Sequence, residues 1–380
     1  MTGETILTGA LLVLPEAVVS GTAVLRGGRI AEVQPGRSAA AAAVDLAGDY
    51  LLPGIVDLHS DNLERQAQPR TTARWPSRSA LMAHDAQCAV AGITTVLDAL
   101  CVGYSPGFDD NRKRTFREGV ADLEALAGTG LLRTEHLLHL RCEIAAADMP
   151  AMFDPVAEHP LVRMVSLMDH CPGFGQYADL EFYRMLRRRD GVDETAIERH
   201  IVAAQAERAQ VRESNRRTVL GRMAERTIAV ASHDDRTAEE VAENAAAGIR
   251  ISEFPVSAEA ATAARALGMQ VVVGAPNLVR GGSHSGNVAV ADLIARGAVD
   301  ALASDYVPAS LVEAAFACAA VGRIALPQAV GFITEHPARM VGLDDRGRIA
   351  PGQRADLVRV RLHEGLPVVR EVWRAGDRVA

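Results

Sequence analysis

From residue 51 to about residue 344, short apolar runs alternate with segments whose apolar positions have helical spacing. Several helical segments stop at a glycine suited to end a helix, namely Ser79–Ala91, Thr237–Ala247, Ala258–Leu267 and Val288–Arg296. Because helices join parallel strands in this order, the pattern predicts an α/β fold, a TIM-like (β/α)₈ barrel over residues 51–344. The predicted strands are Ile55–His59, Ile93–Leu100, Leu137–Ile144, Val162–His170, Thr227–His233, Arg250–Phe254, Gln270–Gly274 and Asp300–Asp305.

Both ends of the chain have a different pattern, with short alternating stretches separated by turns such as Gly27-Gly28 and Pro35-Gly36. We expect the two ends to pair with each other as a composite β-sandwich domain of residues 1–50 plus 345–380. The polar stretch Ala178–Arg226, rich in arginine, glutamate and alanine, predicts a helical insertion between the fourth and fifth strands of the barrel. Its charges are expected to form a solvated helix face and not a site.

The composition narrows the class of protein. With 380 residues, 48% of them hydrophobic, the chain can bury a core large enough for one barrel and a smaller unit. The net charge of −8 argues against a partner nucleic acid or membrane surface. No long apolar span and no signal-peptide order occur, which predicts a cytoplasmic protein. The cysteines include no C-x-x-C pair, so we expect buried thiols and no disulfide framework.

Ionisable side chains recur at the carboxyl ends of the predicted strands, where barrels of this type carry their chemistry. His59 and Asp61 lie two positions apart and share one face of a strand, although this pair alone fits a surface turn equally well. Since several unpaired carboxylates are too costly to bury without a cation, the recurrence predicts a centre for two divalent ions. The predicted metal ligands are His59, Asp61, Glu143, His170, His233 and Asp305, with Glu143 as the bridging carboxylate. Asp169, Asp234, His139 and Glu253 are reserve ligands, for which the role of orienting the other ligands is favoured.

A divalent ion at these strand ends predicts a hydrolase. A bound ion lowers the pKa of a water molecule to about 7, and we assign to Asp305 the catalytic role of accepting its proton during attack. One or two ions are expected, with zinc favoured by the imidazole and carboxylate donors, and manganese or iron as alternatives. A carboxylated lysine is disfavoured as a bridge, because the only lysine, Lys113, lies in a polar run.

The stretch Ala275–Asn287, after the seventh strand, has the composition of a phosphate-binding loop. Its paired glycines permit a nest of backbone N–H groups, and its polar side chains add donors. The predicted substrate-binding residues are Arg280, Ser283, His284, Asn277, His84 and Arg65. The alternatives are a flexible loop for Ala275–Asn287, a solvated side chain for Arg65 and plain packing for His84.

The motifs resemble those of the amidohydrolase superfamily. Pro53-Gly54-Ile55-Val56-Asp57-Leu58-His59 opens the barrel, and Gly352-x-x-Ala355-Asp356-Leu357-Val358 belongs to the closing domain. More narrowly, the runs around His59, His170 and His233, together with Arg280 to Asn287, are similar to the α-D-ribose 1-methylphosphonate 5-triphosphate diphosphatases of the carbon–phosphorus lyase pathway. The usual His-x-His is His59-Ser60-Asp61 here, a form that the narrower family shares. Glu253 occupies the place of the histidine that ends the sixth strand, which leaves the assignment of His170 to the second metal open.

The resemblance implies hydrolysis of a ribose 5-triphosphate that carries a methylphosphonate at C1, giving the 5-phosphate and pyrophosphate in phosphonate catabolism. The partner is then a small phosphorylated ribose, and we expect a homo-oligomer. The first alternative is an amide or nucleobase hydrolase of the deaminase type, because the same activated water attacks carbonyl or amidine carbon in most superfamily members. The second is a non-catalytic barrel in a phosphonate-processing assembly, which the presence of all six candidate ligands disfavours.

Overall fold

The computed structural model describes residues 4–70, 72–104, 110–283, 286–321 and 324–380. The chain forms two compact units, one of Met1–Asp98, Gly119–Leu137 and Val273–Ala380, the other of Ala99–Glu118 and Leu138–Val272. The strands are β1 Thr5–Val13, β2 Val18–Arg26, β3 Arg29–Pro35, β4 Val44–Asp45, β5 Tyr50–Pro53, β6 Ile55–Ser60, β7 Ile93–Val102, β8 Glu135–Glu143, β9 Val162–Met168, β10 Ala229–His233, β11 Ile251–Glu253, β12 Gln270–Gly274, β13 Ala301–Ala303, β14 Leu357–His363, β15 Leu366–Arg374 and β16 Asp377–Arg378.

In the sequence, the helices lie between β6 and β14. They are α1 Asn62–Ala67, α2 Ser77–Val90, α3 Asp110–Leu126, α4 Met149–Phe153, the 3₁₀ helix Gly175–Tyr177, α5 Leu180–Arg189, α6 Glu194–Arg226, α7 Ala238–Ala246, α8 Ala258–Ala266, α9 Ala275–Arg280, α10 Val290–Ala295, α11 Ser310–Val321, α12 Leu326–Gly331 and α13 Glu335–Met340. Within the described residues, no helix combines the length and the apolar character needed to cross a membrane.

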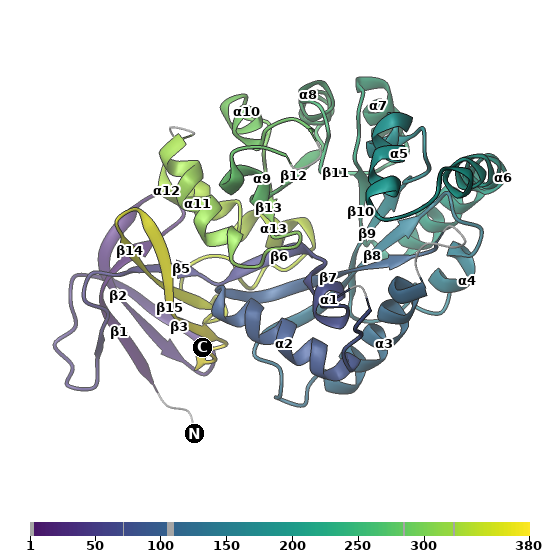
Figure 1. Ribbon diagram of the computed structural model, residues 1–380. Helices are drawn as coiled ribbons and strands as arrows, with labels where there is room; N and C mark the ends of the chain where they lie inside the picture. Colours follow the sequence, from purple (N-terminus) through teal and green to yellow (C-terminus); the bar gives the residue numbers. More distant parts are fainter. Residues whose placement is uncertain (1–3, 71, 105–109, 284–285, 322–323) are drawn as a thin grey trace. The chain divides into compact units, whose positions relative to one another are not determined.

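One sheet joins the two ends of the chain (Figure 1). Its order is β16-β15-β14-β5-β1-β2-β3, with β4 beside β1. The link between the ends is the antiparallel pair β14–β5, where Leu357 lies opposite Pro53. Leu7, Leu25 and Trp373 are buried in its core. The prediction that both chain ends build one separate sheet is therefore confirmed.

The second sheet has the order β13-β12-β11-β10-β9-β8-β7-β6. The pairs β6–β7, β8–β9, β9–β10, β10–β11 and β11–β12 are parallel. Its first and last members also meet, because Asp305 N donates to His59 O at 2.9 Å and Asp61 N donates to Asp305 O at 3.0 Å. Every predicted barrel strand corresponds to one of these strands, with ends that differ by a few residues. The fold is the predicted (β/α)₈ barrel.

Local signals explain the helix ends. The glycines that follow the predicted helices have positive φ, 89° at Gly92, 87° at Gly248, 76° at Gly268 and 64° at Gly297, as a helix-ending residue requires. The stretch predicted as a helical insertion contains α5 and the long α6 (Figure 1), whose first turn is capped by the Asp193 carboxylate. The short helix α9 was not predicted, because the sequence between Ala275 and Asn287 had been taken for a loop.

Gly54, between β5 and β6, is required by close packing. A Cβ at this position would lie 2.4 Å from Thr94 Oγ1 and 2.6 Å from Asp356 Cβ. Its N–H donates to Asp356 O at 2.7 Å, which ties the start of the barrel to the segment that leads into β14. The strand that carries His59 is thus fixed at its first residue.

All five cysteines are free and buried. Burial raises the pKa of the Cys171 and Cys318 thiols to about 12. They are therefore neutral packing groups at physiological pH, as the prediction of buried thiols requires.

Candidate metal centre

One cluster of candidate ligands lies in the unit that contains Leu138–Val272. His170 follows β9, His233 is the last residue of β10, and Asp234 comes next with a positive φ of 57°. Asp234 Oδ2 lies 3.5 Å from His170 Nε2 and 3.6 Å from His233 Nε2. The two imidazole rings meet edge to face, with centroids 5.6 Å apart.

Carboxylates behind the rings fix how the imidazoles face. His233 Nδ1 bonds to Glu253 Oε2 at 2.6 Å, so the ring presents Nε2 to Asp234. Glu253 Oε1 also lies 3.8 Å from His139 Nδ1, and His139 Nε2 is 2.9 Å from Ser166 Oγ. A carboxylate behind a ligating imidazole raises its basicity and selects its tautomer. Glu253 thus contacts the His233 ring from behind, and His139 lies next to Glu253.

His170 lies between two carboxylates. Its Nδ1 is 3.0 Å from Glu143 Oε2, and its backbone N–H donates to Glu143 Oε1 at 3.1 Å. Burial lowers the pKa of His170, but Asp234 and Glu143 raise it by more, to about 9. Burial raises the pKa of Asp234 while the charges of His233 and His170 outweigh it, so this carboxyl ionises below its usual pKa. The site thus stabilises a positive charge.

The donor set of this cluster fits a divalent ion. One ligand atom from each of His170, His233 and Asp234 lies within 4.8 Å of the others. Separations of 3.5 and 3.6 Å exceed a charge-assisted hydrogen bond of about 2.8 Å and match two ligands of one ion at about 2.1 Å each. Asp234, a reserve ligand for which an orienting role was favoured, belongs to this cluster, because the left-handed turn after β10 carries its side chain to the rings.

Three of the predicted ligands lie in the other unit, at the ends of β6 and β13. The buried His59 accepts a backbone bond from Asp305, and Asp61 precedes α1. Asp305 has a positive φ of 54°, a left-handed backbone conformation that aspartate tolerates better than most residues. Asp57 stabilises this strand end, since its Oδ1 accepts from His59 N at 3.3 Å and from Ser304 N at 3.0 Å.

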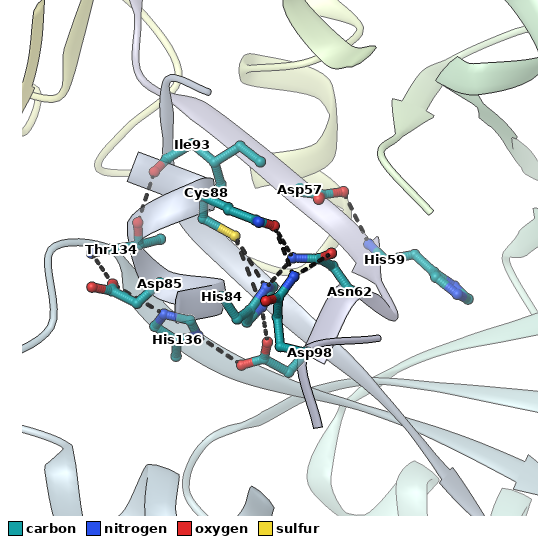
Figure 2. A network of polar contacts seen from close by, with 12 residues as sticks. Asp57, His59, Asn62, His84, Asp85, Cys88, Ile93, Asp98, Thr134 and His136 are labelled. Atoms are coloured by element: carbon teal, nitrogen blue, oxygen red, sulfur yellow. Dashed lines mark hydrogen bonds and ion pairs between the residues drawn. The ribbon is translucent and has the colours of Figure 1, made fainter. Parts of the chain in front are cut away.

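A buried polar network lies in the same unit as β6, and Figure 2 shows it. Asp98 links two imidazoles, with His84 Nε2 at 2.7 Å and His136 Nδ1 at 2.8 Å. The remaining ring nitrogens contact Asn62 at 3.0 Å and Asp85 at 3.3 Å. The side chains of His84 and Asp98 are fully buried. His84 is thus held by protein groups, which favours packing over substrate contact.

The stretch after β12 differs from the predicted loop. Gly281 ends α9 with a φ of 80°, and the N–H groups of Gly281 and Gly282 bond to the carbonyls of Leu278 and Asn277. These N–H groups are used to end the helix, so the prediction of a backbone nest at these glycines is wrong. A Gly-Gly pair is typical of a helix end as well as of an anion-binding loop. Asn277 Oδ1 accepts from Val290 N at 3.0 Å and so holds the start of α10.

The other predicted substrate-binding residues differ in their exposure and contacts. Arg280 is exposed at the end of α9, and Ser283 is half-buried. Arg65 is exposed and donates to Tyr306 O at 2.6 Å. His284 lies outside the described residues.

The arginines of the helical insertion are more than a solvated face. Arg187 and His200 line a cavity with His170, and Arg208 and Arg212 line another with His233. Arg208 and Arg212 also hold Asp169, at 2.8 and 3.0 Å. The prediction that these charges form only a solvated face is therefore wrong for Arg187, Arg208 and Arg212, which line cavities. An amphipathic pattern marks the polar side of a helix but not whether water or a cavity lies beside it.

The chain is similar to known proteins in sequence and in fold. A family model described as the amidohydrolase family matches residues 192–380. Alpha-D-ribose 1-methylphosphonate 5-triphosphate diphosphatase of Escherichia coli is 41% identical over 377 residues, 98% of this chain and 100% of that protein. N-acetyl-D-glucosamine-6-phosphate deacetylase from Mycobacterium smegmatis has a TM-score of 0.63 at 17% identity, covering 99% of this chain and 100% of that one. Dihydropyrimidinase from Brevibacillus agri has a TM-score of 0.59 at 13% identity, covering 99% and 95%. The chain belongs to the amidohydrolase family of hydrolases.

Proposed function

We propose that the protein is a diphosphatase that hydrolyses the 5-triphosphate of α-D-ribose 1-methylphosphonate 5-triphosphate, giving the 5-phosphate and pyrophosphate in phosphonate catabolism. The observation that carries the proposal is the 41% identity to the Escherichia coli enzyme over 98% of this chain and the whole of that protein. An alignment of this extent includes every strand end at which a ligand was predicted.

The residues of the metal cluster have separate roles in this reaction. His170, His233 and Asp234 supply two imidazole nitrogens and a carboxylate oxygen within 4.8 Å, a donor set suited to zinc and also to manganese or iron. When bound, a divalent ion activates water and offsets charge on the phosphoryl oxygens. Glu253 keeps the His233 ring oriented through the 2.6 Å bond to Nδ1. Glu143 holds His170 in the same way from the other side.

The proposal retains the remaining residues predicted from the sequence. His59, Asp61 and Glu143 are proposed ligands, and Asp305 is proposed both as a ligand and as the group that accepts the proton of the attacking water. The exposed Arg280 is proposed to meet phosphate oxygens, with Ser283, His284, Asn277 and Arg65 as further contacts.

Phosphorus NMR of the products tests the reaction. Metal-reconstituted protein is given α-D-ribose 1-methylphosphonate 5-triphosphate, and pyrophosphate is expected as the released species. The Asp234→Asn variant is expected to lose both metal and turnover, whereas Glu225→Gln, an exposed position on α6, is expected to match the wild type. Stepwise release of orthophosphate would contradict the diphosphatase reaction. Release of ammonia from cytosine, or ring opening of a hydantoin to an N-carbamoyl amino acid, with the triphosphate left intact, would support an amide or nucleobase hydrolase instead.

A further inference from the structure

One face of the long helix α6 contacts the two turns that follow β8 and β9. The first turn comes directly after Glu143 and the second contains His170, so both carry groups around the metal cluster. The contacting residues of α6 lie three or four positions apart and therefore share a helix face. They are Gln205, Arg208, Arg212 and Asn215. The helix and both turns belong to the unit that contains Leu138–Val272, so α6 holds both turns within one compact unit.

The residue directly before His170 is held by two arginines of α6. Arg208 Nε and Nη2 each lie 2.8 Å from Asp169 Oδ2, and Arg212 Nε donates to the same oxygen at 3.0 Å. The side chains of Arg208 and Asp169 are 19% and 17% exposed, so this pair is shielded from water, unlike the surface ion pairs that contribute little. The carbonyl of Asp169 packs against Gly175, where a Cβ would lie 2.8 Å away. Asp169 is therefore fixed at its side chain and at its backbone.

The same helix face also holds the chain after His170. Gln205 Nε2 donates to Pro172 O at 3.0 Å, two residues beyond the imidazole. The guanidinium carbon of Arg208 lies 3.4 Å from the ring centre of Phe174, so one arginine contacts this turn on both sides of His170. The backbone that carries His170 is thus fixed before and after the ligand.

The turn after β8 is held by an amide of α6. Asn215 Nδ2 donates to Ile144 O at 3.0 Å and to Ala146 O at 2.8 Å. Asn215 is only 4% exposed, and a buried side chain that faces two carbonyl oxygens has to supply N–H donors. Ile144 directly follows Glu143, whose Oε2 lies 3.0 Å from His170 Nδ1. Asn215 therefore fixes the carboxylate that contacts the imidazole from the other side.

We propose that Arg208 and Asn215 are positioning residues, which hold the turns after β9 and β8 so that His170 keeps its place in the metal cluster. The inference rests on the proposed function, because it takes the divalent ion of that proposal as the group that His170 binds. Metal affinity depends on the groups that hold the ligands as well as on the ligands themselves. Without these contacts the turn is free to move, and the separation of 3.5 Å between His170 Nε2 and Asp234 Oδ2 is no longer maintained.

Arg208 alone does not separate positioning from substrate binding. It lines the cavity beside His233, where a substrate group has access to its guanidinium. Asn215 is not among the described residues that line this cavity or the one beside His170. A change of metal binding on replacing Asn215 therefore reports the position of the ligands and not a lost contact with substrate.

The test compares Arg208→Ala and Asn215→Ala with the control Arg222→Ala. Arg222 belongs to the same helix and pairs with Glu158 at 3.3 Å, with side chains 39% and 73% exposed. The control thus removes an arginine ion pair from α6 that involves neither turn. Circular dichroism and melting temperature verify that each variant is folded, and two variants that affect different turns guard against the loss of one.

The first readout is the binding of Co²⁺ to the metal-free protein, followed by the visible absorption of the bound ion, which depends on its ligands. Asp234→Asn removes a ligand of the cluster and identifies the absorption that belongs to it. Arg208→Ala and Asn215→Ala are expected to bind Co²⁺ about 10-fold more weakly and to alter this absorption, while Arg222→Ala matches the wild type. Arg208→Lys keeps a cation for Asp169 and is expected to recover part of the affinity.

The second readout is turnover of the ribose triphosphate at saturating metal. Both positioning variants are expected to lower kcat with KM changed far less, because they displace a ligand of the ion and not a group that binds substrate. The proposal is overturned if both variants match Arg222→Ala in Co²⁺ affinity and absorption. A raised KM in Arg208→Ala, with Co²⁺ binding unchanged in both variants, identifies a substrate contact and also contradicts the positioning role.

Failure of the proposed function gives a different result. A wild-type protein that leaves the triphosphate intact refutes the diphosphatase reaction, whereas the Co²⁺ measurements need no substrate. Weaker Co²⁺ binding in Arg208→Ala and Asn215→Ala then supports the positioning role without the reaction. Absence of Co²⁺ binding to the wild type refutes the positioning role together with the metal cluster.

Discussion

The buried histidine His136 is expected to make the stability of the protein fall at alkaline pH. Its Nδ1 lies 2.8 Å from Asp98 and its Nε2 lies 3.3 Å from Asp85 (Figure 2). Burial lowers the pKa of His136, but these two carboxylates raise it by more, from 6.5 to about 9. The folded protein therefore holds a proton that the unfolded chain releases near pH 6.5.

The sign and size of the effect follow from this difference. A group whose folded pKa is raised stabilises the fold fully below its unfolded pKa and loses that contribution as pH rises through the folded pKa. For His136 the loss runs from about pH 6.5 to about pH 9. At 1.36 kcal/mol per pH unit, this corresponds to about 3 kcal/mol. Asp98 sets the acid limit of this stabilisation. Despite its burial, His136 and His84 lower its pKa from 3.8 to about 2, so its contribution to stability is lost as the pH falls through this range.

The assay is urea denaturation of the wild type and of His136→Asn between pH 5 and pH 10. The asparagine amide keeps a donor for Asp98 but carries no charge. At pH 6 the variant is expected to be about 3 kcal/mol less stable, and its stability should change little with pH, so that the two profiles converge above pH 9. His363→Asn, at an exposed position of β14, is the control and should follow the wild type. If His136→Asn loses as much stability with pH as the wild type does, another group carries the alkaline loss and the assignment is refuted.

Three further outcomes test the fold and the metal cluster. Gly54→Ala places a Cβ 2.4 Å from Thr94 Oγ1 and is expected to cost about 3 kcal/mol in the free energy of unfolding, measured by denaturation. Asp49→Ala removes the carboxylate 2.6 Å from Arg359, which keeps Glu371 at 2.7 Å, and is expected to cost about 2 kcal/mol, with a lower melting temperature as the readout. Dialysis against a chelator is expected to abolish turnover and restoring zinc to recover it, whereas Asp234→Asn should stay at least about 100-fold less active after reconstitution, as elemental analysis and turnover together can verify.

The barrel could be predicted because its strands and helix ends depend on residues that are close together in the sequence. Strands buried on both faces need continuous apolar runs, and helices that end in a left-handed residue need glycine, as at Gly92 and Gly248. Helix α9 escaped prediction because six residues are too few for a periodic pattern. Its closing glycines then resembled an anion-binding loop.

The groups around the metal cluster could be predicted only in part. His170 and His233 lie at strand ends, a position that sequence order reveals. Asp234 reaches them through a left-handed backbone conformation, which the residue types around it do not predict. Arg187 belongs to a helix whose charged residues have the same spacing whether they face water or a cavity, so its role depends on tertiary packing.

The contrast between two of the histidine clusters, the one around Asp98 and the one around Asp234, supports the proposal of a metal at the second. In the network around Asp98, the histidine side chains are at most 1% exposed, and contacts of 2.7 and 2.8 Å are ordinary hydrogen bonds that protons already occupy. Around Asp234, the distances to His170 and His233 are 3.5 and 3.6 Å, and the His170 side chain is 20% exposed beside a cavity. The first arrangement satisfies its own charges and has no described route for an ion. The second has the separation that two ligands of one ion require and lies beside a cavity, which favours it as the proposed metal site.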